Sequence, residues 1–268
     1  MLTFHLVKID YDSLAIGYAL SRNVNPRTLE RLKGLGRVTE ESRVLEVGCG
    51  SGNYLAAMME ATGCRGHGLD PSTAMLTQAR ARGPAAVWTR GVAQSLPYPD
   101  AAFDFLFCVD VIHHVPDPGE FFREAFRVLR PGGRLAVATD SDWSIQERNP
   151  LSVFFPETIE VEMRRYPPID RQREWMAVAG FRAIAIEVVE APCELVSDEA
   201  FRAKAFSCLL LIPQSAYEAG MKRLTDALSR GPLPCVARHV VLSATCPIDA
   251  PGDRASAAAG DRLPVSAS

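Results

Sequence analysis

Short apolar runs alternate with segments of helical periodicity through the first half of the chain. Polar and apolar residues do not alternate within these runs, which predicts strands buried on both faces of a parallel sheet. Helices are expected between them, starting near Asn53, Ser72 and Pro118. This order favours right-handed βαβ units and an α/β fold. The predicted strands cover residues 44–47, 65–70, 85–89, 103–109 and 134–139.

The pattern changes after the fifth predicted strand. Residues 141–170 lack a clear period and contain several prolines, and a long irregular segment beside the carboxyl end of a strand is typical of a lid or binding loop. A helix at 171–179 and a sixth strand at 181–189 follow. Two more helical patterns, one capped by Ser197 and one at 214–229, predict a helical insertion. This insertion covers a substrate pocket or, alternatively, serves only core packing.

These changes divide the chain into parts. The last part is rich in Ala, Ser and Gly and has too few apolar residues to fold, so we expect it to be disordered. The expected parts are an N-terminal helical cap at residues 1–40, a core at 41–189 with a lid at 141–170, a helical insertion at 190–237, a last core strand at 238–247 and a tail at 248–268.

The first strand runs into a glycine turn. Residues 43–53 read Arg-Val-Leu-Glu-Val-Gly-Cys-Gly-Ser-Gly-Asn, and Gly48, Gly50 and Gly52 stand where the chain must turn sharply into a helix. Glycines in such a turn let a ligand approach the backbone, and the N–H groups of the following helix face the same space. We therefore expect a ligand site at the carboxyl end of this strand.

Two acidic residues indicate which ligand fits. Asp70 ends the second strand, about twenty positions beyond the glycines, where an acid accepts hydrogen bonds from ribose hydroxyls. A dinucleotide fingerprint would need glycine where the chain has Asn53. Glu46, beside the turn, would repel a pyrophosphate but attract an ammonium group. The pair therefore favours a nucleoside with a cationic amino-acid tail over NAD.

Composition excludes several classes of protein. The chain has 268 residues, 47% of them apolar and 23% charged, as in an ordinary soluble protein. A net charge of −3, without a basic cluster, argues against a nucleic-acid partner. No apolar run is long enough to span a membrane, and the amino terminus lacks the pattern of a signal peptide.

Cysteine usage indicates the compartment. The seven cysteines are odd in number and form no Cys-x-x-Cys pair, which predicts neither a disulfide framework nor a zinc site. We therefore expect a cytoplasmic protein with no bound metal. The cysteines are Cys49, Cys64, Cys108, Cys193, Cys208, Cys235 and Cys246.

Four blocks of sequence carry a resemblance to a known family. They read Val-Leu-Glu-Val-Gly-Cys-Gly-Ser-Gly at 44–52, Gly-Leu-Asp-Pro-Ser at 68–72, Ser-Leu-Pro-Tyr-Pro-Asp-Ala-Ala-Phe-Asp at 95–104 continuing to Pro116, and Val-Leu-Arg-Pro-Gly-Gly-Arg at 128–134. In order and spacing they resemble the class I S-adenosylmethionine-dependent methyltransferases, among them the small-molecule branch of ubiquinone and menaquinone methyltransferases. The likeness covers residues 11–140.

The resemblance implies a fold and a cofactor. The fold is a Rossmann-like, seven-stranded, mostly parallel sheet with helices on both faces, and its last strand is antiparallel, with residues 239–245 as the candidate. The cofactor is S-adenosyl-L-methionine, with Glu46 at the methionine ammonium, Asp70 at the ribose and Met75 against the adenine. The expected cofactor-binding residues are Tyr11, Tyr18, Glu46, Gly48, Cys49, Gly50, Gly52, Asp70, Pro71, Ser72, Met75, Val92, Ala93, Gln94, Cys108 and Asp110.

Two features of that set remain open. In the family, a tyrosine-bearing helix like the one with Tyr11 and Tyr18 closes over the cofactor, although here it is equally an amphipathic helix packed on the sheet. Many relatives carry an acid after the glycine that corresponds to Gly91, where it contacts the adenine amino group. This chain has Val92 there, so backbone groups or Gln94 would have to replace that contact.

Candidates for the acceptor side follow the fourth strand and lie in the lid and insertion. His113 and His114 come after Asp110, and either could act as a general base or simply form a structural turn. The expected substrate-binding residues are Trp143, Tyr166 and Phe206, whose aromatic rings suit an aromatic or isoprenoid-like acceptor.

The sequence therefore predicts a methyltransferase that acts on a small, fairly apolar metabolite, with oxygen, nitrogen and carbon acceptors all open. One alternative is methylation of arsenite, which needs cysteines that converge, whereas Cys193, Cys208 and Cys235 are far apart in the sequence. Another alternative is a module that keeps the fold and binds the cofactor without transferring a methyl group. A monomer and a homodimer are both compatible with the sequence.

Overall fold

The structure, a computed structural model, describes residues 24–248. The strands in it are β1 Arg43–Val47, β2 Arg65–Asp70, β3 Val87–Arg90, β4 Phe103–Val109, β5 Leu129–Thr139, β6 Arg182–Leu195 and β7 Leu233–Thr245. The helices are α2 Pro26–Gly36, α3 Asn53–Thr62, α4 Thr73–Arg82, η1 Ile112–His114, α5 Pro118–Val128, α6 Asp142–Gln146, α7 Leu151–Phe154, α8 Glu157–Arg165, α9 Ile169–Val178, α10 Glu199–Arg202, η2 Ser207–Leu210 and α11 Gln214–Leu228.

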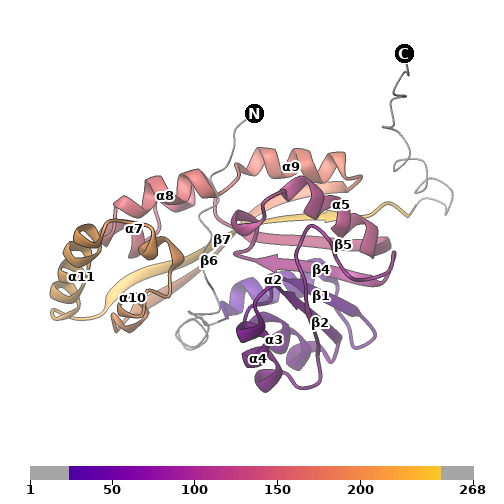
Figure 1. The fold of residues 1–268 in the computed structure, drawn as a ribbon, viewed down its shortest axis with the longest axis horizontal. Coiled ribbons are helices and arrows are strands. Elements are labelled where there is room, and N and C mark those ends of the chain that lie inside the picture. The colour runs from indigo at the N-terminus through magenta and orange to yellow at the C-terminus, as the bar shows by residue number, and fades with distance from the viewer. Residues whose placement is uncertain (1–23, 249–268) are drawn as a thin grey trace, which may run out of the picture.

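The strands form one seven-stranded sheet in the order β3-β2-β1-β4-β5-β7-β6 (Figure 1). All pairs among strands β1 to β5 are parallel, whereas β7 runs antiparallel to both β5 and β6. The predicted mostly parallel, Rossmann-like sheet with an antiparallel last strand is confirmed. Because β1 and β4 lie at the centre, their carboxyl ends meet at the position where such sheets bind ligands.

Helices cover both faces of the sheet. On one face α2 and α3 pack on the central strands through Leu32, Leu55 and Met58, and on the other α5 packs through Phe121 and Phe122. β1 shows why both faces need cover, since four of its five residues are buried and neighbours point to opposite faces. This arrangement holds the strand ends rigidly around the glycine turn.

The last two strands are longer than predicted. β6 continues to Leu195 instead of ending at residue 189, and β7 begins at Leu233 instead of near residue 239. Apart from an irregularity at residues 182–185 they pair throughout, and they project from the sheet as a two-stranded ribbon (Figure 1). Helices α7, α8, α10, η2 and α11 pack together at its far end. We call these helices, residues 151–165 and 199–228, the helical lobe.

Two segments differ from the prediction within this region. Residues 141–170 are not irregular but form three short helices, the first fixed by a capping box between Ser141 and Ser144. The helix expected after Ser197 is only the short α10. Lys204, with a φ of 49°, adopts a left-handed conformation that a helix cannot continue, and the chain resumes as η2.

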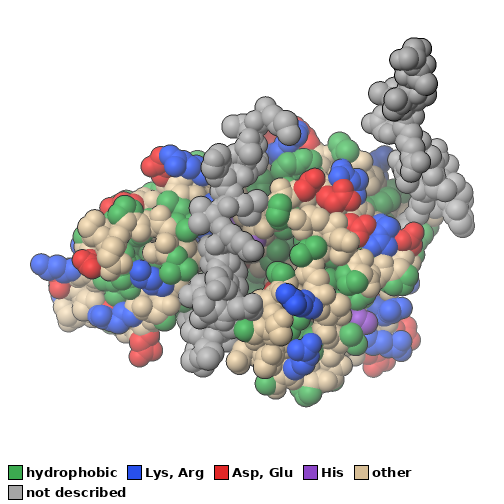
Figure 2. All heavy atoms as spheres, viewed as in Figure 1, with side chains coloured by type: hydrophobic (Ala, Val, Ile, Leu, Met, Phe, Trp, Pro, Cys, Tyr) green, Lys and Arg blue, Asp and Glu red, His purple; other side chains and the backbone are tan. Residues whose placement is uncertain are grey.

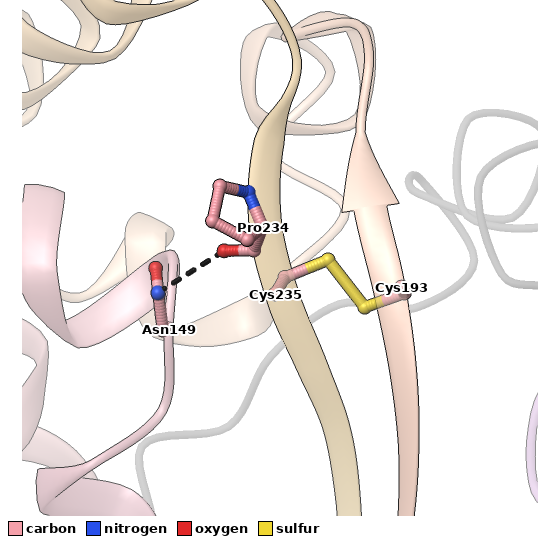
Figure 3. The surroundings of a disulfide bond; sticks show 4 residues. All are labelled: Asn149, Cys193, Pro234 and Cys235. Atoms are coloured by element: carbon pink, nitrogen blue, oxygen red, sulfur yellow. Dashed lines mark hydrogen bonds between the residues drawn. A yellow bond between two sulfur atoms is a disulfide. The ribbon is translucent and has the colours of Figure 1, made fainter.

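A disulfide corrects the interpretation of the cysteines. Cys193 and Cys235 face each other across β6 and β7, with their Cα atoms 5.0 Å apart, and are bonded. Figure 3 shows this bond beside the Asn149 side chain, whose Nδ2 donates to the carbonyl oxygen of Pro234 at 3.2 Å. Forty-two positions separate the two cysteines, so spacing alone did not indicate the pair. The prediction from spacing that the cysteines are unpaired is therefore wrong for this pair.

Charges are spread over the surface. On the face in Figure 2, Lys and Arg side chains alternate with Asp and Glu over both the sheet and the helical lobe. Within residues 24–248, no helix is both long and apolar enough to cross a bilayer.

Candidate functional site

A cavity of about 380 Å³ lies where the glycine turn, the end of β4 and the helical lobe meet. The sheet contributes the turn after β1 and the segment after β4, while the ribbon and lobe contribute the opposite wall. Its lining includes Glu46, Gly48, Cys49, Gly50, Asp110, His113, Asp140, Arg148, Glu162, Tyr166, Cys193, Leu195, Phe201, Phe206, Cys208, Cys235 and His239. The cavity thus joins the predicted cofactor side to the predicted acceptor side.

The glycine turn is held tightly at one end and open in its middle. The N–H groups of Gly48 and Cys49 both donate to Leu69 O, at 2.7 and 3.0 Å. A Cβ on Gly48 would lie 2.4 Å from Val111, and Gly48 has a φ of 69°, so only glycine fits there. At Gly50, in contrast, a Cβ would meet no atom of residues 24–248 within 4 Å. The backbone at Gly50 is therefore open to a ligand.

Gly52 makes room for a side chain of the protein itself. A Cβ there would lie 2.5 Å from the indole of Trp88, and Gly52 does not line the cavity. The same indole would lie 2.3 Å from a Cβ on Gly68. Both glycines make room for Trp88, whose Nε1 donates to Gly83 O at 2.9 Å. Because these two glycines lack side chains, β2, β3 and the helices beside them can pack closely.

Glu46 places a carboxylate in the cavity wall. Its side chain is buried, and Oε2 accepts a hydrogen bond from Leu55 N at 3.0 Å. Burial raises the pKa of Glu46 well above its ordinary value, the Leu55 N–H opposes this shift, and the negative charge of Asp70 adds to it. A cation in the cavity would restore the charged form, which makes Glu46 a suitable partner for an ammonium group.

Asp70 braces the turn from the neighbouring strand. Its Oδ2 accepts from Gly50 N at 2.8 Å and its Oδ1 from Ser72 N at 2.9 Å. Ser72 in turn caps α4 by accepting from Met75 N at 3.1 Å. These two backbone bonds hold the Asp70 carboxylate beside the glycine turn.

Several other expected cofactor residues do not line the cavity. Cys108 is fully buried within β4, Ala93 is buried, and Val92 is 48% exposed. Tyr11 and Tyr18 lie outside the described residues. The expected residues that do not line the cavity are Gly52, Asp70, Pro71, Ser72, Met75, Val92, Ala93, Gln94 and Cys108.

Asp110 stands at the junction of the two sides. It follows β4 with a φ of 57°, an uncommon conformation for a residue with a side chain. His239 on β7 places Nε2 3.6 Å from Asp110 Oδ1, and its Nδ1 lies 2.9 Å from Thr28 Oγ1 on α2. Three separate elements thus fix this carboxylate at the cavity wall.

Of the two histidines, only His113 lines the cavity. Its ring stacks on Tyr166 with centroids 4.0 Å apart. Burial, followed by the neighbouring His114 and Arg165, lowers the pKa of His113 well below its ordinary value, so the ring is neutral near pH 7. His114 instead lies with Nδ1 3.4 Å from a guanidinium nitrogen of Arg165.

The lid contributes a charged cluster that sequence reasoning did not assemble. Arg148 lies between Asp140 and Glu162, with nitrogen–oxygen distances of 3.2 Å to each. Arg165 also binds Glu162, at 2.7 Å, and reaches Ser207 Oγ at 3.2 Å. The three-residue spacing of Glu162 and Arg165 could have indicated their pair, but nothing in the sequence places Arg148 beside them.

The three expected substrate-binding residues separate in space. Tyr166 and Phe206 both line the cavity. Trp143 does not line it, is 45% exposed, and is covered on one face by the guanidinium of Arg238 at 4.3 Å from the ring centroid. Its ring is therefore already occupied by a cation–π contact.

The sheet order, the antiparallel β7 and the glycine turn between two acid-ended strands together define a class I methyltransferase fold. Residues 45–137 match the family model described as a methyltransferase domain. Residues 45–137 thus form a methyltransferase domain of the class I, S-adenosylmethionine-dependent type.

Curated relatives match part of the chain. The 27-O-demethylrifamycin SV methyltransferase of Amycolatopsis mediterranei is 37% identical over 117 residues, 41% of this chain and 43% of that protein. The demethylmenaquinone methyltransferase of Listeria welshimeri is 34% identical over 149 residues, 53% of this chain and 62% of that protein. The chain thus spans about half the length of the curated relatives it matches.

A solved structure resembles nearly the whole fold. A putative methyltransferase from an antibiotic biosynthesis pathway of Anabaena variabilis superposes with a TM-score of 0.67 at 22% identity, covering 84% of this chain and 99% of that one. At this identity the likeness concerns the fold.

Proposed function

We propose that the protein transfers the methyl group of S-adenosylmethionine to a small, fairly apolar metabolite. The observation that carries the proposal is the pair of carboxylates around the glycine turn. Glu46 lines the cavity at the end of β1, and Asp70, at the end of β2, holds the turn through Gly50. A pair of acids suits a nucleoside with a cationic tail and disfavours a dinucleotide pyrophosphate.

The residues present fit this cofactor. The open backbone at Gly50 gives room for it, Glu46 offers a buried carboxylate to its ammonium group, and Asp70 is held beside the same turn, where its carboxylate would meet the ribose. When bound, the cofactor supplies a methyl group on a positively charged sulfur, an excellent leaving group. The protein then mainly has to hold donor and acceptor in line and exclude water.

The cavity supports an acceptor of modest size. Its lining beyond the glycine turn mixes aromatic and aliphatic side chains with Asp110 and His113 at the end of β4. A neutral His113 can accept a proton from an acceptor hydroxyl or orient it, and Asp110 can hold that hydroxyl in place. Oxygen, nitrogen and carbon acceptors all remain within this proposal.

A labelling experiment tests the function. The protein is incubated with a metabolite extract and methyl-labelled S-adenosylmethionine, and products are identified by mass spectrometry. We expect labelled methyl in one or a few small products and stoichiometric formation of S-adenosylhomocysteine. Donor binding without donor consumption in several extracts would instead indicate a binding module that has kept the fold.

One observation favours a second candidate, methylation of trivalent arsenic. Cys193, Cys208 and Cys235, far apart in the sequence, all line the cavity, and two of them are bonded to each other. Within residues 24–248, however, no three His, Cys, Asp or Glu side chains are grouped to hold a metal ion. An assay of the protein with arsenite, a thiol reductant and labelled donor decides between the candidates. Formation of methylated arsenic by the wild type, and its loss in Cys208→Ser, would favour the second.

A further inference from the structure

Asp110 and His239 meet at one edge of the sheet. Strand β5 lies between β4 and β7 and ends at Thr139, which pairs with Val240. Asp110 is the first residue after β4, and His239 directly precedes Val240 on β7. Both side chains therefore stand at the end of β5 and meet across it, with His239 Nε2 3.6 Å from Asp110 Oδ1.

The other side of the His239 ring is fixed by α2. Thr28 is fully buried, and its Oγ1 lies 2.9 Å from His239 Nδ1. Thr28 itself stands in the first turn of the helix, where its N–H donates to the capping Asn25 Oδ1 at 3.3 Å. A carboxylate only accepts hydrogen bonds, so a neutral His239 that binds Asp110 carries its proton on Nε2. The Thr28 hydroxyl then donates to Nδ1, which holds the ring in one orientation and one tautomer.

The cavity gives a ligand access to this pair. Both side chains line the cavity, and 18% of the Asp110 side chain and 12% of the His239 side chain are exposed. The Asp110 carboxylate is therefore within reach of an acceptor. Asp110 also has a φ of 57°, and residues in such uncommon conformations cluster at functional sites because the conformation costs free energy. The pair is thus placed to act on a ligand.

The reaction demands an aligned acceptor. Methyl transfer is an in-line displacement, so the lone pair of the acceptor atom has to point at the methyl carbon. An acceptor O–H or N–H that donates to Asp110 is oriented only as well as the carboxylate itself is held. His239 restrains that carboxylate from β7. Their separation of 3.6 Å exceeds a normal hydrogen bond, and active-site contacts of this kind often shorten when the substrate binds.

We propose that His239 is a positioning residue for the methyl transfer. Through Nε2 it holds the Asp110 carboxylate toward the reacting O–H or N–H of the acceptor, and Thr28 fixes its ring from behind. Asp110 is the group that touches the acceptor, and His239 acts through it. This inference rests on the proposed function and adds two residues, His239 and Thr28, to the same site.

Nitrogen-15 NMR tests the arrangement without any turnover. The full-length protein is loaded with S-adenosylhomocysteine and measured at a pH where the His239 ring is neutral, and its signals are those lost in His239→Gln. We expect the proton on Nε2 and an unprotonated Nδ1. In Thr28→Val, which keeps the shape of the side chain but lacks the hydroxyl, the Nδ1 signal should shift because it loses its hydrogen bond.

A double-mutant cycle tests whether His239 acts through Asp110. The rate is that of labelled methyl transfer into the product formed from the metabolite extract. His239→Leu should lower this rate by about tenfold, as loss of one hydrogen bond to a charged group does, and Asp110→Asn should lower it by at least about tenfold. The double variant should be no slower than Asp110→Asn alone, because two residues that act as one unit do not add.

Two further variants exclude a merely structural effect. His239→Gln, whose side-chain amide keeps an N–H donor for Asp110, should regain most of the rate lost in His239→Leu. His67→Leu is the matched control, because His67 is a partly buried histidine of β2 that packs on Phe103 and does not line the cavity. It should keep the wild-type rate. S-adenosylhomocysteine affinity, measured by calorimetry, should be that of the wild type in His239→Leu and reports that the variant is folded.

Three results would overturn this proposal alone. They are a neutral His239 ring protonated on Nδ1, a wild-type rate in His239→Leu, and losses in His239→Leu and Asp110→Asn that multiply in the double variant. A wild-type protein that forms no labelled product from any extract would instead overturn the proposed function, and this proposal with it.

Discussion

Glu46 ties ligand binding to stability. The unfolded chain releases the Glu46 proton near the ordinary glutamate pKa of about 4.3, whereas burial makes the folded protein hold it to higher pH. The folded state is therefore increasingly disfavoured as pH rises from the unfolded pKa to the folded one. Without a partner, the buried Glu46 carboxylate lowers stability at neutral pH. A bound cation would remove this cost, as expected of a cation site.

Replacing this carboxyl should separate the two effects. Glu46→Gln keeps an oxygen for Leu55 N and removes the titration, so we expect a higher Tm than wild type at about pH 8 and little difference near pH 4. Each kcal/mol gained should raise Tm by about 2–4 °C. Donor affinity measured by calorimetry should fall in the same variant. A lower Tm at pH 8 would contradict the buried-charge interpretation.

His113 should titrate outside the usual range. Because burial and the nearby His114 and Arg165 lower its pKa, the ring should remain neutral at about pH 6.5, where an exposed histidine is half protonated. Nitrogen-15 NMR of the imidazole rings measures the protonation of this ring directly. The His113 signals are assigned as those that disappear in the His113→Gln variant, and the ring in question is the one stacked on Tyr166. Protonation of that ring near pH 6.5 would count against a neutral His113 in the site.

At the scale of elements, the helical lobe depends on a close helix contact. Gly220 on α11 faces α7, and a Cβ there would lie 2.3 Å from the Phe155 ring and 2.8 Å from Phe154 O. Gly220→Ala should therefore destabilise the protein by about 1–3 kcal/mol. Gly34→Ala, on α2 with no atom within 4 Å of its Cβ, is the control and should be neutral or stabilising. Chemical denaturation compares them, and equal effects would refute the contact.

The disulfide is the second feature at this scale. It joins β6 and β7 where the ribbon carries the helical lobe, across 42 positions of sequence. Constraining such a loop in the unfolded chain should contribute about 2–4 kcal/mol. We expect dithiothreitol to lower the denaturation midpoint of the wild type and to leave the Cys193→Ser, Cys235→Ser double variant unchanged. A wild type insensitive to reductant would show that the bond contributes nothing.

Across the whole molecule, the sheet was predictable because most of its strands can be recognised from their own short stretch of sequence. Runs such as 103–109 are apolar on both faces, so they fit only a covered parallel strand, and β4 spans those residues. The ends of β6 and β7 were not predictable. Their outer halves, such as residues 190–195, are mostly exposed, and cross-strand pairing, which leaves no local pattern, holds them together.

The site divides in the same way. The glycine turn, Glu46 and Asp70 were predictable because strand, turn and acid follow one another within a few residues of sequence. The position of Arg148 was not predictable, because Arg148 lies in the loop between α6 and α7, its partner Glu162 lies on α8, and the cavity is formed by the fold of the ribbon. Nor did the sequence show that Gly52 makes room for Trp88, because this is a contact between distant segments. The sequence alone therefore does not predict the parts of the site that are formed by residues from distant segments.

The most direct test of the central claim is calorimetric titration of the protein with S-adenosylmethionine and, separately, with NAD. We predict binding of S-adenosylmethionine, no binding of NAD, and an affinity at least about tenfold weaker in Asp70→Ala, with thermal melting to show that the variant is folded. Binding of NAD, no binding of S-adenosylmethionine, or an unchanged affinity in folded Asp70→Ala would contradict the account.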